Sequence, residues 1–173
     1  MDQKRTREEA VRAGIVIRML AGSYDLMILL AIAFIAFIPV SMAEEQFGPS
    51  PEWLKQVLLT ILVFAYLSGF WMKGGATTGM RPWNLQVAMI DTGNHPALSM
   101  AVVRAFCLSL TWLSLATTLM YMAMRQTDDL IFFLSASIPA ISLFCMLLTP
   151  QRQALHDVLA GTSVYRLNKK TTV

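Results

Sequence analysis

Charged residues are scarce in this sequence, and so are the side chains that hold metals. Only 14% of the 173 residues are charged, and 55% are hydrophobic. Soluble domains average about 25% charged residues. The two cysteines, Cys107 and Cys145, lie in apolar runs without Cys-x-x-Cys spacing, and the two histidines do not cluster. These shortages argue against a soluble domain and against metal or redox chemistry, so we expect neither a metal nor a cofactor.

Sequence patterns typical of enzymes are also missing. No Ser-His-Asp order, no catalytically spaced pair of carboxylates and no metal-ligand spacing supports an enzyme. The run GGATTG at 74–79 is rich in glycine but lacks the Lys-Ser/Thr of a P-loop, so a tight chain reversal explains it better. We therefore expect a non-enzymatic protein that does not bind nucleic acid, folded as one domain over residues 1–173.

Apolar runs without any charge dominate the rest of the chain. Each is 17 to 20 residues long, and they lie at 26–43, 56–72, 105–124 and 130–149. A helix needs about 20 residues to cross the hydrocarbon core of a bilayer, and its backbone polar groups are then satisfied internally. With a few flanking residues added, we expect transmembrane helices at about 18–43, 55–72, 104–124 and 130–149. The predicted fold class is an all-α membrane protein with four transmembrane helices.

Lysine and arginine are divided unequally between the two sides of this bundle. Twelve of them lie in the N-terminal segment, the 73–104 connection and the tail, whereas only Lys55 and Arg125 lie in the other two loops. Segments rich in these residues face the cytoplasm, so we expect both termini and the long connection to be cytoplasmic. Trp53 and Trp71 flank the second span, where aromatic residues of the membrane interface are expected.

Three segments outside the spans carry weaker patterns. Residues 1–17 suit either a short amphipathic helix at the membrane surface or a plain extension of the first span. In the cytoplasmic loop 73–103, the partly alternating LQVAMI at 85–90 precedes the turn signal DTGN, which predicts a small β-hairpin or an extended loop. The C-terminal segment 150–166 has apolar residues spaced for a short amphipathic helix that Gly161 ends.

Two charged residues lie at the start of the first span, within the stretch RMLAGSYD. An ionisable side chain in the membrane costs roughly 2.5–3.5 kcal/mol on insertion scales, so it suggests a function or a specific partner. Arg18 and Asp25 are seven residues apart, which puts them on one helix face but about 10 Å apart along the axis. They cannot touch each other, and Ala21 and Gly22 leave room for another element between them.

Further polar residues are expected on the same side of the membrane. Arg104 opens the third span, and His156 and Asp157 lie in the tail. Together with Arg18 and Asp25 they predict one polar network at the inner face. Such a network could relay an ion or a proton, or bind a polar substrate. Alternatively, it could be a structural lock that fixes the helix registry and neutralises buried charge.

These polar residues fall in four motifs that resemble those of the RDD family of bacterial membrane proteins, named for one arginine and two aspartates. The motifs are RMLAGSYD, GATTGMRPWNLQV, VVRAF and QALHDVLAGTSV, and the resemblance runs from about residue 14 to residue 166. Met80 separates the last glycine of the second motif from its arginine, whereas the family usually has a basic residue straight after that glycine. The matching residues are Arg18 and Asp25; Gly75, Thr77, Gly79 and Arg81; Arg104; and His156 and Asp157.

The resemblance implies a multi-pass protein of the bacterial inner membrane and leaves two functions open. Transport of unknown ligands has been suggested for the family, and some members are linked to sodium/proton exchange. One hypothesis is thus a small transporter or cation/proton exchanger, in which Asp25 and Asp157 bind the ion and an arginine supplies the alternating counter-charge. The alternative is a non-catalytic subunit or scaffold that binds a partner membrane protein.

The expected partners follow from the size and charge of the chain. A bundle of 173 residues is small for alternating access, so a homo-oligomer or a partner membrane protein is expected. The basic inner side, which includes Lys73 and Arg81, is expected to face anionic lipid headgroups.

Overall fold

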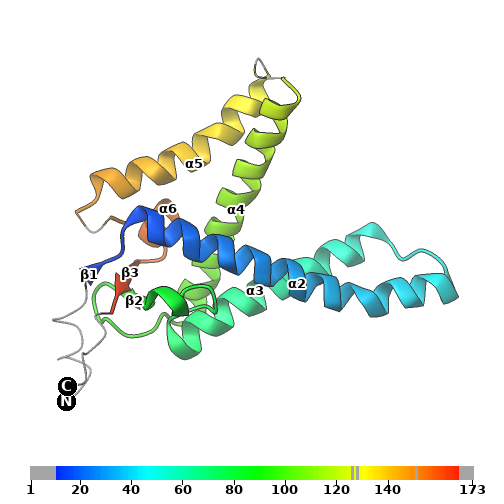
Figure 1. The fold of residues 1–173 in the computed structure, drawn as a ribbon, viewed down its shortest axis with the longest axis horizontal. Coiled ribbons are helices and arrows are strands. Elements are labelled where there is room, and N and C mark those ends of the chain that lie inside the picture. Colours follow the sequence, from blue (N-terminus) through cyan, green and yellow to red (C-terminus); the bar gives the residue numbers. More distant parts are fainter. Residues whose placement is uncertain (1–10, 126, 128, 151, 168–173) are drawn as a thin grey trace.

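A computed structural model describes residues 11–125, 127, 129–150 and 152–167 (Figure 1). Four long helices dominate it: α2 (Ile15–Phe47), α3 (Glu52–Gly74), α4 (Leu98–Ala123) and α5 (Leu130–Leu148). The shorter elements are β1 (Val11–Arg12), the 3-10 helix η1 (Arg81–Trp83), β2 (Leu85–Met89), α6 (Leu155–Leu159) and β3 (Thr162–Arg166). The molecule is therefore mostly helical, with one small sheet.

Four long helices form where the sequence predicted four membrane spans. Each is long and apolar enough to cross a membrane. They form two hairpins, α2 with α3 and α4 with α5, which diverge from the end of the molecule that holds α6 and the three strands (Figure 1). We call this end the sheet end. The first helix has 33 residues and is about 50 Å long, so it is longer than the hydrocarbon core of about 30 Å.

Hydrogen bonds from hydroxyl groups connect α4 to α5 close to a proline. Pro139 lies inside α5 and has no N–H, so the carbonyl of Ser135, four residues earlier, lacks its usual helix donor. The Ser114 hydroxyl of α4 donates to that carbonyl, and the Thr118 hydroxyl donates to Ser135 Oγ at 3.0 Å. The helix continues through the proline because a neighbouring helix supplies the missing hydrogen bond.

The sheet corrects the prediction of a β-hairpin within the 73–103 loop. Its strand order is β1-β3-β2 with antiparallel pairing, so β2 pairs with β3 of the tail and not within a hairpin of the 73–103 loop. The expected turn does form after β2, since Gly93 N–H donates to the Met89 carbonyl at 2.8 Å. However, Pro96 follows soon after and cannot donate to a sheet ladder, so no returning strand forms there.

The two chain ends compare differently with the short amphipathic helices expected there. Val11–Arg12 forms strand β1 and α2 begins at Ile15, so the prediction of an N-terminal amphipathic helix is wrong for this part of 1–17. Residues 1–10 lie outside the described residues. A short helix does form in the tail, where α6 ends at Leu159 just before Gly161, whose φ is +60°. The chain then turns into β3, which the sequence did not predict.

Candidate functional site

A fully buried aspartate joins the tail to two long helices at the sheet end. Asp157 of α6 is 0% exposed. Arg18 of α2 donates from Nη1 to its Oδ2 at 2.7 Å, and Nη1 of Arg104, from α4, forms an ion pair with Oδ1. The backbone N–H of Ala154 donates to Oδ2 at 3.2 Å. We call Arg18, Arg104, His156 and Asp157 the Asp157 cluster.

The two arginines of this cluster are also fixed by the sheet and by α3. Arg104 Nη1 donates to Thr162 Oγ1 at 2.5 Å, and Arg18 Nη2 donates to the Val164 carbonyl at 3.2 Å. The Arg104 guanidinium lies over the Trp71 ring, 4.8 Å from its centroid. Trp71 is only 2% exposed, so it packs inside the protein and is not the interface aromatic that the sequence suggested. The guanidinium thus gains a cation–π contact in a buried site.

The electrostatics of α6 follow from burial beside two guanidinium groups. Burial alone would raise the pKa of the Asp157 carboxyl, but Arg104, His156 and Arg18 and the Ala154 N–H together lower it to about 2. Burial lowers the pKa of His156 to about 4; Asp157 opposes this effect, and Arg104 and Arg18 add to it. Near neutral pH the cluster therefore holds two arginines, one carboxylate and a neutral histidine.

This depressed histidine pKa predicts a loss of stability in mild acid. Unfolded His156 takes up a proton below about pH 6.5, whereas in the folded protein its pKa is about 4. Between these values the unfolded state binds more protons, so the free energy of unfolding rises with pH. We expect stability to be complete above pH 6.5 and to fall by up to about 3 kcal/mol as the pH drops towards 4. Thermal unfolding of detergent-solubilised protein at a series of pH values measures this.

Two histidine variants separate this effect from other titrations. His156→Gln should flatten the dependence of the unfolding temperature on pH between 6.5 and 4. His95→Gln, which changes an exposed loop histidine, should leave that dependence as in the unmodified protein. An equal dependence in the His156 variant and the unmodified protein would contradict the assignment.

The second aspartate lies in a separate cluster of neutral donors. Asp25 of α2 is 8% exposed. Its Oδ1 accepts hydrogen bonds from the Tyr66 hydroxyl at 2.7 Å and from the Gly79 N–H at 2.9 Å. Its Oδ2 accepts one from the Thr77 hydroxyl at 2.5 Å. We call Asp25, Tyr66, Thr77 and Gly79 the Asp25 cluster.

The prediction of a single charge network is therefore wrong for Asp25. Within the described part of the chain, no ion pair joins Asp25 to an arginine. The other four predicted residues, Arg18, Arg104, His156 and Asp157, do come together. The expectation that Arg18 and Asp25 lie too far apart to touch agrees with this division into two clusters.

The start of the second motif, GATTG at 75–79, forms the loop that holds the Asp25 carboxylate. Gly75 ends α3 in the left-handed region at φ +65°, and a Cβ there would lie 2.6 Å from Nδ1 of His95. Thr77 supplies its hydroxyl to the carboxylate. Gly79 comes so close to α2 that a Cβ would lie 2.6 Å from the Ala21 carbonyl oxygen and 2.7 Å from the Asp25 nitrogen. The structure thus explains all three residue types: a side chain would clash at either glycine, and the threonine supplies a hydroxyl donor.

Three further residues, Arg81, Gly22 and Tyr66, compare differently with the sequence expectations. Arg81, which follows the motif, belongs to neither cluster; its guanidinium lies 5.6 Å from the centroid of the Phe70 ring. Gly22 does allow a close approach, since a Cβ there would lie 3.1 Å from the Trp112 ring. Tyr66 was missed by the sequence analysis, although its hydroxyl is a polar group in an otherwise uncharged apolar run.

One comparison with known proteins identifies a family for this chain. The model of the RDD family matches residues 12–161, a range that contains both clusters. Neither the comparison with curated proteins nor the one with solved structures gives a match. The family match covers most of the chain. Four helices of the chain are long and apolar enough to cross a membrane. The chain therefore belongs to the RDD family, as a multi-pass membrane protein.

Proposed function

We propose that the chain is a non-catalytic subunit or scaffold of the bacterial inner membrane, in which the Asp157 cluster is a structural lock. One observation supports this most. Both carboxylate oxygens of the fully buried Asp157 already face arginines, Arg18 at Oδ2 and Arg104 at Oδ1. A transported cation would have to displace a buried guanidinium to reach Asp157, and an unpaired buried charge is strongly unfavourable.

The setting in the membrane is part of the same proposal. The excess of lysine and arginine in the two terminal segments and the 73–104 connection supports a cytoplasmic sheet end. The apolar outer surfaces of the two diverging hairpins would then face lipid, a second copy of the chain or a partner membrane protein. The basic residues of the sheet end would lie among anionic lipid headgroups.

Cation or proton exchange is the second candidate, and it rests on Asp25. The three hydrogen bonds to this buried carboxylate come from neutral groups, those of Tyr66, Thr77 and Gly79. A carboxylate without a counter-charge in the membrane can be neutralised by a proton or a small cation. In this case exchange would use the Asp25 cluster alone, and the Asp157 cluster would still be structural.

Flux through proteoliposomes, measured with Asp25→Asn, tests the proposal. We expect the unmodified protein to give no sodium-coupled or proton-coupled flux above that of protein-free liposomes. The variant should lose about 1.5–3 kcal/mol of unfolding free energy, because one oxygen that accepts hydrogen bonds becomes a donor. The measurement pairs a pH-sensitive dye in the liposomes with thermal unfolding of the same preparations.

Asp129→Asn is the matched control, because Asp129 is exposed and makes no side-chain cap to α5. It should change neither flux nor stability. Flux in the unmodified protein that Asp25→Asn abolishes without any loss of stability would overturn the proposal and establish the second candidate.

A further inference from the structure

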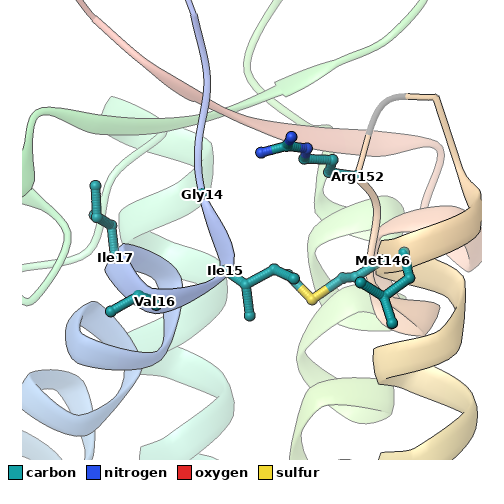
Figure 2. A pocket seen from close by; sticks show the side chains of 7 residues that line it. Gly14, Ile15, Val16, Ile17, Met146 and Arg152 are labelled. Atoms are coloured by element: carbon teal, nitrogen blue, oxygen red, sulfur yellow. The ribbon is translucent and has the colours of Figure 1, made fainter.

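An open pocket lies between the first and the last long helix at the sheet end. Its volume is about 430 Å³, and it is lined by the start of α2, the end of α5 and Arg152 (Figure 2). It shares no residue with the Asp157 cluster or the Asp25 cluster. Because α2 and α5 diverge from this end (Figure 1), the pocket lies where the two hairpins begin to separate.

The walls of this pocket are apolar. Ile15 of α2 and Met146 of α5 point toward one another across it (Figure 2). Val16 and Leu147 also line it and are largely exposed on the outer surface of the two helices. Both helices are candidate membrane spans, so in a membrane these walls would lie near the edge of the hydrocarbon core. A hydrocarbon chain therefore fits the walls better than a polar solute does.

The rim of the same pocket is positively charged. Arg152 lies over the gap between the two helices (Figure 2) and is exposed. Arg12 Nη1 donates to the carbonyl of Pro150, which brings a second guanidinium close to the same stretch of chain. The first turn of α2 starts at the rim with Gly14 as its N-cap and no side-chain cap. Its free N–H groups add a partial positive charge. No acidic residue lines the pocket as described.

We propose that this pocket binds one anionic phospholipid from the surrounding membrane. Its phosphate would lie between Arg152 and the first turn of α2, and one acyl chain would pass between Ile15 and Met146. Charge complementarity selects this occupant. The apolar walls give a soluble phosphate nothing to contact, and an apolar helix of a second copy would leave the guanidinium without a partner.

Native mass spectrometry of the full chain, released from detergent with added lipid, tests the site. The probes are phosphatidylglycerol and phosphatidylcholine with the same acyl chains. We expect one phosphatidylglycerol to be retained in preference to phosphatidylcholine. Arg152→Gln should weaken that retention about fivefold, the effect of one basic side chain near an anionic surface. Leu147→Trp, which partly fills the pocket, should lower retention as well.

Two controls separate binding in this pocket from a general attraction between anionic lipid and the basic sheet end. Arg166→Gln changes an exposed arginine of β3 at the same end, and it should leave retention within about twofold, as expected for a charge outside the site. Glycerol phosphate, the soluble headgroup, should not displace the lipid. Equal losses in the Arg152 and Arg166 variants, equal retention of the two lipids, displacement by glycerol phosphate or a retained second copy would each overturn the proposal.

Discussion

Asp157→Asn is expected to destabilise the protein by about 3–5 kcal/mol, the usual effect of removing one partner from a buried ion pair. Without the carboxylate, Arg18 and Arg104 keep their charges, and their side chains are only 9% and 4% exposed. The tail would also lose the hydrogen bond from the Ala154 N–H. Because the margin of stability of most proteins is about 5–15 kcal/mol, we expect a sharp fall in the yield of folded protein. Urea or thermal unfolding in detergent measures the loss.

Asp91→Asn is the control for this prediction. Asp91 is an exposed aspartate in the turn after β2, so its replacement should change the free energy of unfolding by no more than about 0.5 kcal/mol. If Asp157→Asn had an equally small effect, the two arginines would have to be stabilised by other groups, and the structural lock would be wrong.

Gly79→Ala is expected to have the second-largest effect. The added Cβ would lie 2.6 Å from the Ala21 carbonyl oxygen and 2.8 Å from Asp25 Cγ. Backbone of a long helix cannot yield as a flexible side chain does, so the loop would have to move away from α2. The change would then lose the 2.9 Å hydrogen bond from the Gly79 N–H to Asp25. Overpacking and the lost hydrogen bond together should cost about 3 kcal/mol or more.

Gly69→Ala makes the same chemical change in the middle of α3, where a Cβ meets nothing within 4 Å. It should be neutral or stabilise the protein by about 0.5–1 kcal/mol, because alanine favours the helix. Thermal unfolding of both variants in one detergent gives the comparison. Similar stability for the two variants would show that the loop does not need its close contact with α2.

The local patterns of the sequence predicted much of the fold. Uncharged runs of helical length predicted the four long helices, and LQVAMI predicted β2 because strand patterns depend on neighbouring residues only. The sheet itself depends on pairing between β2 and β3, which lie far apart in the chain. No local pattern in TSVYR specified that partner, and the hairpin prediction chose the nearest segment instead.

Only part of the candidate site could be predicted from the sequence, because residue type reveals charged partners but not neutral ones. Arg18 and Arg104 carry charges opposite to that of Asp157. Their pairing could therefore be predicted from residue type alone. Asp25 was assigned to the same network because its true partners carry no charge. One of them is the backbone N–H of Gly79, and a backbone donor leaves no signature in the residue type that supplies it. The resemblance to the RDD family pointed to Thr77 and Gly79 as motif residues. Their contact with α2 is visible only in the structure.

A double-mutant cycle on Arg18 and Asp157 tests the structural lock most directly. The free energy of unfolding is measured for the unmodified protein, Arg18→Met, Asp157→Asn and the double variant. If the ion pair holds the tail against α2, the coupling energy should be at least about 1.5 kcal/mol, with the double variant more stable than the sum of the single losses predicts. Losses that add to within about 0.3–0.5 kcal/mol would contradict the lock.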